Sequence, residues 1–382
     1  MDLDFTEEQE ILRTSARNFL KKECDHERVR EIEDSEDGYS KEIWRKMAEL
    51  GWMGIAFPEQ YGGYGGEFMN LIILMEEIGR GILPSPFFST VVLSGFTILE
   101  GGSEDQKKEF LEKIAAGELI MALALYEGNG SYKPSGITTK ATRHDGAFVI
   151  EGQKMFVNDA NVADYLIVAT RTRQRASPEE GITLFLVGTK SKGVSCNKIR
   201  TIGADNQCEV ILAHVIVPKE NMLGDLDKGW PILNKAIEKA TVVKCAEVMG
   251  GMEASLEMTN GYAKEREQYG KTIGSFQVIQ HYLANMFIKV HTAKNLTYEA
   301  AWMAGEQLPC AYKVSAAKSY VNEAYKFVTE RGVQIHGAIG TTREHSMGLY
   351  YRRAKAADLF LGDTAHHLEL VAQELFSQTQ HP

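Results

Sequence analysis

The sequence predicts a multidomain α+β protein in which a central β domain lies between two helical domains. Three observations lead to this prediction. Apolar residues recur at helical spacing over residues 1–120, in short β-branched runs over residues 121–225, and again at helical spacing over residues 226–382. We therefore expect an N-terminal helical domain, a central antiparallel β-barrel or sheet, and a C-terminal four-helix bundle.

The N-terminal domain is expected to consist of capped helices. Thr6 and Gln9 form a capping box in front of an apolar pattern with a helical period. Polar residues that begin such patterns, and glycines that end them, mark three more helices. These are predicted from Ser40 to Gly51, over residues 69–79, and from Ser103 to Gly117.

The central and C-terminal stretches differ in the period of their apolar residues. Four β-branched runs separated by Gly, Asn and Asp turns predict strands. They are residues 148–152, 164–171, 182–188 and 208–218. Farther on, long patterns rich in Ala and Met predict helices that pack as a bundle. The first of these runs from near Trp230 to Arg266, and two more begin near Ser275 and Tyr312.

Composition restricts the class of protein. The 382 residues are enough for two or three packed units, and 44% hydrophobic with 25% charged residues is typical of a soluble globular protein. A net charge of −10 argues against a surface that mainly binds nucleic acid. No apolar run reaches the roughly 18–20 residues of a membrane span, and the acidic start MDLDFTEEQE lacks an export signal. We expect a cytoplasmic protein.

Cysteines and histidines are scattered along the chain. The five cysteines form no CxxC pair, and their odd number is typical of a reduced protein. The adjacent pair His366 and His367 lacks the spacing of a metal-binding motif. We therefore expect neither a disulfide nor a metal site.

Three segments indicate chemistry when they are considered together. They are EGQKMFVNDANVADYLIVATR (151–171), AKEREQYGKTIGSFQVIQH (263–281) and VQIHGAIGTTREHSMGLYYRRAK (333–355). Each alone is a weak motif, because GAIG is only a tight turn and Arg-x-x-Tyr-Gly is a short string. On an α–β–α chain, at these separations, they resemble the acyl-CoA dehydrogenase flavoprotein family. The resemblance covers nearly the whole chain.

Within that family, the chain is most similar to the small-subunit type of pimeloyl-CoA dehydrogenase. This closer likeness lies in GSFQVIQH (274–281), the GTTREH…LYYRR run (340–353) and LGDTAHHLEL (361–370). The resemblance implies an FAD-dependent oxidoreductase that acts on the CH–CH group of an acyl-CoA thioester with a dicarboxylic, branched or alicyclic acyl group. It also implies a homotetramer, or a heterotetramer with a related subunit, and an electron-transfer flavoprotein or similar acceptor.

The implied reaction removes a proton from the α carbon and a hydride from the β carbon. Because the α carbon is a very weak acid, the thioester oxygen must accept hydrogen bonds as it becomes negative. A base must also lie within about 3 Å of the departing proton. The cofactor supplies the hydride acceptor, so the protein has to place the substrate against it.

The resemblance assigns cofactor contacts residue by residue. Arg266 matches an arginine that reaches the FAD pyrophosphate from a neighbouring subunit. Gln277, Gln334 and Gly337 match further FAD contacts, and glycine at 337 lets the backbone approach a phosphate closely. The family often has two glycines here, whereas this chain has Ala338 in the second place.

Other assignments concern the flavin ring and the CoA entrance. Phe156 matches a tryptophan that flanks the flavin, and Asn158 matches a threonine or serine near flavin N5. The segment ALYEGNGSYKPSGITTKA (124–141) aligns with the flavin-covering loop but departs from its usual sequence. Tyr126 lies at the start of that loop as a cofactor contact, and Tyr132 replaces a serine that touches CoA.

The catalytic glutamate of the family has no counterpart. Its two alternative positions correspond to Leu361 and Ala240, and neither side chain can take a proton. Next to Leu361, Gly362 matches the family glycine and Asp363 the threonine, so Leu361 and Gly362 are expected at the substrate. Glu238 matches an aspartate that contacts the CoA arm.

Three interpretations of this absence remain open. Asp363 serves as the base, although it could instead bind a flavin hydroxyl or cap the following helix. Alternatively, the chain is a small or non-catalytic subunit of a heteromeric dehydrogenase whose partner carries the glutamate. In the third interpretation the substrate is already unsaturated or cyclic, so that a non-standard elimination or a reduction takes place. Tyr126 is then another polar candidate for the residue that exchanges the proton.

Overall fold

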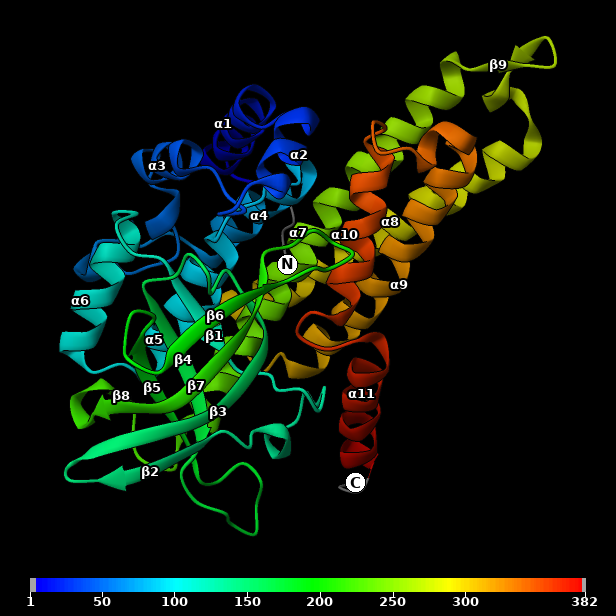
Figure 1. Cartoon of the computed structure of the whole chain (residues 1–382). Helices are drawn as coiled ribbons and strands as arrows, with labels where there is room; N and C mark the ends of the chain where they lie inside the picture. Colours follow the sequence, from blue (N-terminus) through cyan, green and yellow to red (C-terminus); the bar gives the residue numbers. More distant parts are fainter. Residues whose placement is uncertain (1–4, 380–382) are drawn as a thin grey trace. The chain divides into compact units, whose positions relative to one another are not determined.

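The computed structural model describes residues 5–379, and the chain divides into two units (Figure 1). The first unit contains the described residues up to 30, residues 67–83 and residues from 241 onwards, and the second contains residues 31–66 and 84–240. N-terminal and C-terminal helices share the first unit because α4 (Phe68–Gly81) packs against both α1 (Glu7–Glu23) and α8 (Gln277–Gly305).

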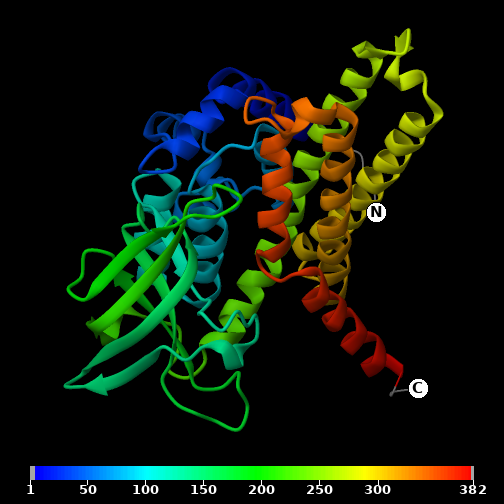
Figure 2. The same ribbon diagram turned by 45° about the vertical axis from the view of Figure 1, so that its right-hand side comes forward.

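The first unit is helical. Helix α9 packs against α8, α10 and α11, and α8, α9 and α10 run side by side in both ribbon views (Figures 1 and 2). A short hairpin of β9 and β10 precedes α8. The remaining elements are α2 (His26–Asp34), α7 (Gly229–Glu265), β9 (Glu267–Gln268), β10 (Lys271–Thr272), α9 (Ala311–His336), α10 (Met347–Leu359) and α11 (Thr364–Thr379). The boundary between the units falls inside two of these helices, so α2 and α7 each have residues in both units.

Helix capping follows the sequence closely. Thr6 Oγ1 accepts a hydrogen bond from Gln9 N, and the Gln9 side chain accepts one from Thr6 N, which confirms the capping box at α1. Ser103 and Gln106 form the same reciprocal pair at the start of α6 (Glu104–Ala115) in the second unit. Ser40 caps α3 (Lys41–Glu49) there, so the predicted helix starts are confirmed.

Helices α4 and α7 cross at glycines in the first unit. A Cβ added to Gly79 would lie 1.8 Å from the carbonyl oxygen of Glu247, and one added to Gly250 would lie 1.8 Å from that of Glu76. Real side-chain atoms never approach a backbone oxygen so closely, so only glycine permits this contact. The crossing brings the two backbones together and fixes how α7 lies against α4.

Two buried carboxylates on α4 are neutralised around the same crossing. Arg17 Nη2 and Nε bind the Glu77 carboxylate at 2.6 and 2.9 Å. Tyr298 OH donates to Glu76, and Arg13 lies 3.6 Å from the same carboxylate. Buried charges of this kind are tolerated because they are paired, and here the pairs connect α1 and α8 to α4.

The second unit contains an eight-stranded sheet with the order β6-β7-β3-β2-β4-β5-β8, in which β1 pairs with β4. A buried π-helical segment (Phe88–Ser94) and α5 (Gly95–Gly101) precede α6. The strands are β1 (Met121–Ala124), β2 (Lys140–His144), β3 (Ala147–Asn158), β4 (Tyr165–Arg171), β5 (Ile182–Gly188), β6 (Val194–Ile199), β7 (Gln207–Pro218) and β8 (Met222–Leu223).

The four predicted strands are found as β3, β4, β5 and β7, but the sheet is mixed rather than purely antiparallel. Strand β1 pairs with β4 in parallel, and β2 makes one parallel pair with β4. The sequence MALA of β1 has no β-branched residue, and the polar sequence VSCNKI of β6 lies at the sheet edge with most side chains wholly or partly exposed. Neither strand therefore shows the apolar β-branched pattern on which the prediction rested.

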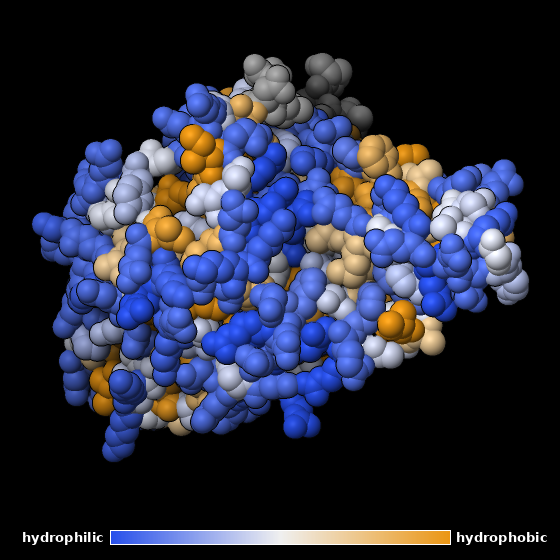
Figure 3. Space-filling model, turned by 90° about the horizontal axis from the view of Figure 1, so that it is seen from above, coloured by the Kyte–Doolittle hydropathy of each residue, from blue (hydrophilic) through white to orange (hydrophobic). Residues whose placement is uncertain are grey.

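The surface agrees with the composition. Figure 3 shows a face on which hydrophilic side chains predominate and hydrophobic ones form small separate groups. Within residues 5–379, no helix has the length and apolarity needed to cross a membrane.

Candidate functional site

The loop between α10 and α11 contains one of the two expected base positions. Leu361 is 4% exposed with a φ of +60°, and Gly362 has a φ of +112°. Asp363 Oδ1 accepts a hydrogen bond from the His366 backbone N–H at 2.8 Å. Asp363 therefore caps the N-terminus of α11, which is one of the roles expected for it from the sequence.

One buried side chain holds this loop and another holds the end of α10 before it, and sequence reasoning missed both roles. His367 Nε2 donates to the carbonyl oxygen of Leu361 at 3.0 Å, because a carbonyl can only accept. Lys318 Nζ donates to Ala357 O and to Asn322 Oδ1, both at 2.7 Å. Burial, and after it the charge of Lys318, lowers the pKa of His367 to about 4. A neutral histidine thus holds the loop at Leu361, and a buried ammonium group binds the last turn of α10.

The other base position is also apolar and buried. Ala240 on α7 is fully buried, and the nearby Glu238 is half-buried. Helical spacing separates Glu238 from Ala240 by about 200°, so their side chains point to different faces of α7. The structure therefore leaves both expected positions without a proton acceptor of their own.

Two of the predicted FAD contacts, Arg266 for the pyrophosphate and Gln277, lie at exposed places in the first unit. Arg266 directly follows α7, Gln277 begins α8, and the β9–β10 hairpin connects them, with Ile273 N donating to Arg266 O at 2.8 Å. Both side chains are exposed. In the part of the chain that the structure describes, the Arg266 guanidinium has no hydrogen bond or ion pair. It is thus available for a phosphate that the chain does not itself supply.

The end of α9 provides a backbone turn of the kind that a phosphate requires. Gly337 has φ +68° and ψ −144°, a conformation that is open almost only to glycine. A Cβ at this position would meet nothing within 4 Å, so the space in front of the turn is open. Gln334, one turn earlier on α9, is exposed as well. These two residues fit an extended phosphate-bearing cofactor.

The predicted flavin contacts lie together in the second unit. Phe156 sits at an irregularity of the β3–β7 pairing, has a φ of +58° and is 47% exposed. A left-handed aromatic residue held at the surface is typical of a functional site. Among the described residues, Asn158 Oδ1 is buried without a hydrogen-bond partner. Tyr126 O accepts from Met155 N at 2.9 Å, and the rings of Tyr126 and Tyr132 meet edge to face at 5.6 Å.

A buried ion pair secures the loop that follows Tyr126. Lys154 Nζ lies 2.7 Å from Glu127 Oε1, and the exposed fractions of the two side chains are 0% and 7%. Lys154 also donates to Leu125 O at 3.1 Å, while Glu127 accepts from the N–H groups of Thr138 and Thr139 at 3.0 and 2.9 Å. Both ends of the loop are therefore fixed to β3.

Acid should lower the folding stability of the second unit, because it protonates the Glu127 carboxylate. Burial alone would raise the pKa of this carboxyl, but the Lys154 ammonium and the hydrogen bonds lower it from 4.5 to about 2. A lowered folded-state pKa stabilises the fold above about pH 4.5, and this stabilisation is lost as the pH falls towards 2. Urea unfolding between pH 7 and pH 3 should therefore show a smaller pH dependence in Glu127→Gln than in the unsubstituted protein. Equal pH dependence of the two proteins would contradict this role.

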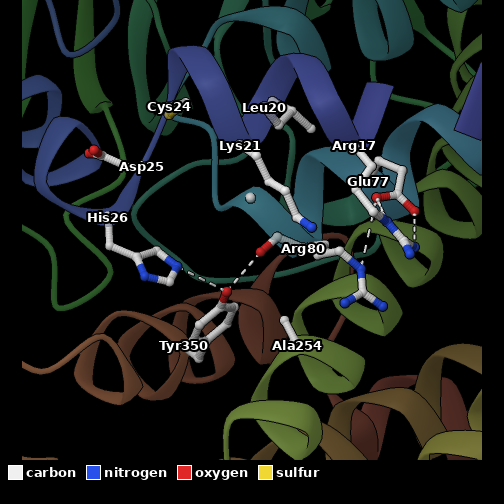
Figure 4. A pocket seen from close by; sticks show the side chains of 11 residues that line it. Arg17, Leu20, Lys21, Cys24, Asp25, His26, Glu77, Arg80, Ala254 and Tyr350 are labelled. Carbon is white, nitrogen blue, oxygen red and sulfur yellow. Dashed lines mark hydrogen bonds and ion pairs between the residues drawn. The ribbon is translucent and has the colours of Figure 1, made fainter. Parts of the chain in front are cut away.

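A separate cavity of about 280 Å³ lies in the first unit (Figure 4). Lys21 of α1 points into it, and His26 Nε2 lies 3.2 Å from Tyr350 OH, which donates to Arg80 O at 2.7 Å. None of the residues predicted to bind cofactor or substrate lines it. Across residues 5–379, no cluster of His, Cys, Asp and Glu that could hold a metal ion is found.

Comparison with known families gives three matches in chain order. The models match the acyl-CoA dehydrogenase N-terminal domain over residues 6–118, the middle domain over residues 122–215, and the C-terminal domain over residues 227–376. The matches cover most of the chain, including the loop of Leu361 and the segments of Arg266 and Phe156.

Individual relatives agree with these matches. Caffeyl-CoA reductase-Etf complex subunit CarC of Acetobacterium woodii is 32% identical over 94% of this chain and 95% of its own length. The short-chain-specific acyl-CoA dehydrogenase of Clostridium acetobutylicum is 30% identical over 98% of this chain and 100% of its own. The solved structure of butyryl-CoA dehydrogenase from Megasphaera elsdenii has a TM-score of 0.91 and 29% identity, covering 98% of this chain and 100% of that one.

Proposed function

The chain belongs to the acyl-CoA dehydrogenase family, whose members are FAD-dependent oxidoreductases of CH–CH groups, and from this we propose that it removes a proton and a hydride from a specific acyl-CoA thioester. The observation that supports the proposal most strongly is the ordered match of all three domains over residues 6–376. We also propose that, within the family, the chain is closest in type to the small subunit of pimeloyl-CoA dehydrogenase, and that its acyl group is dicarboxylic, branched or alicyclic.

Each unit has residues that fit a part of FAD. When bound, this cofactor supplies the hydride acceptor. Arg266, Gln277, Gln334 and the open turn at Gly337 would hold the phosphate-bearing part. In the second unit, the exposed ring of Phe156 would flank the flavin, and the buried Oδ1 atom of Asn158, which has no partner among the described residues, would accept a hydrogen bond from it. Tyr126 and Tyr132 would shape the entrance for the flavin and the CoA moiety.

For the proton, we propose Asp363 as the base, with Leu361 and Gly362 facing the substrate and Glu238 near the CoA arm. Asp363 is the carboxylate that lies in the loop at the expected base position. One of its oxygens caps α11, and the other is a candidate proton acceptor. This assignment combines a structural role with a chemical one, so a test has to separate the two.

Asp363→Asn separates them because asparagine caps a helix as well as aspartate does but takes no proton. We expect the rate of flavin reduction by acyl-CoA to fall about 100-fold or more, with FAD content and thermal midpoint unchanged. Asp363→Ala should in addition lower the unfolding free energy by about 1 kcal/mol. Anaerobic stopped-flow absorbance measures the first effect and urea unfolding the second.

The result of Asp363→Asn discriminates between the interpretations. An unchanged reduction rate would remove Asp363 from the mechanism. Loss of FAD with both substitutions would instead assign Asp363 to cofactor binding.

A second candidate function is that of a small or non-catalytic subunit of a heteromeric acyl-CoA dehydrogenase. The buried, apolar Leu361 and Ala240 favour it, and one relative is by name a subunit of a reductase–Etf complex. Stable co-purification with a related chain that carries the glutamate, and a rate of flavin reduction that Asp363→Asn leaves unchanged, would support it. That relative's name also favours reduction of an unsaturated or otherwise non-standard acyl group as a further variant.

The same proposal extends to the assembly, the location and the electron acceptor of the enzyme. We propose a cytoplasmic homotetramer, or a heterotetramer with a related subunit, that passes electrons to an electron-transfer flavoprotein or a similar acceptor. The exposed Arg266 fits an arginine that reaches the cofactor of a neighbouring subunit. Light scattering with FAD-loaded protein gives the assembly size directly.

A further inference from the structure

The backbone turn at Leu361 and Gly362, between α10 and α11, is both buried and strained. Leu361 has a φ of +60°, in the left-handed region that leucine rarely adopts, and Gly362 has a φ of +112°. A Cβ added to Gly362 would lie 2.6 Å from His367 Nε2 and 2.7 Å from His366 Cδ2, so only glycine leaves room for the two rings. A strained conformation of this kind persists only where its surroundings hold it in place.

The two helix ends that border the turn are fixed by side chains. Lys318 Nζ donates to Ala357 O at 2.7 Å, and Asn322 Nδ2 donates to Asp358 O at 3.3 Å, so α9 binds two carbonyls of the last turn of α10. On the other side, Asp363 caps α11. The turn therefore begins and ends at fixed points.

His367 fixes the middle of the turn. Its Nε2 atom lies 3.0 Å from Leu361 O, so the proton of the neutral ring must be on Nε2. The Nδ1 atom is buried without a hydrogen-bond partner among the described residues. Burial, and after it Lys318, lowers the pKa of His367 to about 4, so the ring is neutral at pH 7. One buried donor in a defined tautomer thus binds the carbonyl of the peptide that joins Leu361 to Gly362.

This contact also determines where the Gly362 N–H group points. The Leu361–Gly362 peptide is trans, and in a planar trans peptide the C=O and N–H bonds point in opposite directions. Because the Leu361 carbonyl points towards His367, the Gly362 N–H points away from it. Within residues 5–379, no acceptor binds the N–H group of Leu361 or of Gly362. Buried N–H groups are almost always paired, so we expect a bound ligand to supply an acceptor.

We propose that His367 is a positioning residue, whose hydrogen bond to Leu361 O aims the Gly362 N–H group at the thioester oxygen of a bound acyl-CoA. The inference rests on the proposed dehydrogenase function, in which this loop faces the substrate and the thioester oxygen becomes negative. A hydrogen-bond donor stabilises that charge most when it is already aimed before the reaction. His367 acts through the peptide and does not contact the substrate.

Two substitutions of similar size separate the hydrogen bond from packing. Glutamine in place of His367 keeps an amide donor near Leu361 O, whereas methionine fills similar space without a donor. We expect His367→Met to lower the limiting rate of flavin reduction per bound FAD about tenfold or more, and His367→Gln to retain most of the rate. The FAD dissociation constant should be unchanged in both. Glu369→Gln, at an exposed position of the same helix, is the control and should keep the full rate.

The rate is measured by anaerobic stopped-flow absorbance with whichever of butyryl-CoA, hexanoyl-CoA, isovaleryl-CoA and adipoyl-CoA binds most tightly. Nuclear magnetic resonance adds a readout that does not need the reaction. His367 should carry its proton on Nε2, and the Gly362 amide proton should shift downfield when the thioester binds. This shift should be present in His367→Gln and absent in His367→Met. If His367→Met does not fold, His367→Asn replaces it, because its amide is too short to reach Leu361 O.

Equal rates in His367→Met and the unsubstituted protein, or equal slowing in His367→Met and His367→Gln, would overturn the inference and leave the dehydrogenase function intact. Loss of FAD with an unchanged rate per bound FAD would also overturn it, because the contact would then serve cofactor binding. A Gly362 shift without any flavin reduction would contradict the proposed function and keep the inference. The absence of both the shift and the reduction would overturn both.

Discussion

Gly250→Ala should lower the unfolding free energy by about 3 kcal/mol or more, or prevent soluble accumulation. The added Cβ would lie 1.8 Å from the Glu76 carbonyl oxygen at the crossing of α4 and α7. Neither backbone can move far, because Glu76 and Glu77 on α4 are held by Tyr298 and Arg17. The midpoint of urea or thermal unfolding measures the loss.

Gly261→Ala is the matched control. It lies on the same helix, and a Cβ there meets nothing within 4 Å. Alanine should raise stability at this position by up to about 1 kcal/mol, since glycine is a poor helix former. A Gly250→Ala protein as stable as Gly261→Ala would show that the helices can separate without cost, which the crossing geometry excludes.

Lys154→Met should cost about 3–5 kcal/mol because it leaves the Glu127 carboxylate buried without its ammonium partner. The double variant Glu127→Gln/Lys154→Met should recover most of that loss, since a neutral amide still accepts from the N–H groups of Thr138 and Thr139. Urea unfolding of the two single variants and the double variant gives the coupling energy of the pair.

The pair also has a functional consequence. It fixes the segment that follows Tyr126 to β3, the strand that carries Phe156 and Asn158. FAD content should therefore fall in Lys154→Met and return in the double variant. Additive effects of the two substitutions would contradict the coupling and assign the loop's position to other contacts.

The sequence predicted those parts of the fold that depend on local patterns. The capping box at Thr6 and the helix start at Ser103 need only side chains three residues apart, and the long apolar patterns of α7, α8 and α9 need only a constant period. Strand β1 escaped prediction because four buried residues without β-branching look the same in a helix or a strand.

The candidate site was predictable only where a motif fixes a residue. Arg266 and Gly337 were assigned through the resemblance to the family, and both are exposed in the structure; their contacts with FAD stay a prediction. His367 and Lys318 could not be singled out, because their roles arise from contacts among α9, α10 and α11, which are distant in sequence. A lysine in an otherwise apolar helical pattern was the available signal, and such a residue is more often solvated than buried.

The most direct test of acyl-CoA dehydrogenase chemistry is the absorbance of the purified protein under anaerobic conditions. We expect a yellow protein with about one FAD per chain, whose flavin absorbance near 450 nm bleaches on addition of an acyl-CoA and returns with an electron acceptor. Arg266→Met should lose FAD. A flavin that no acyl-CoA reduces, in the homomer or with a related subunit present, would contradict the proposed reaction.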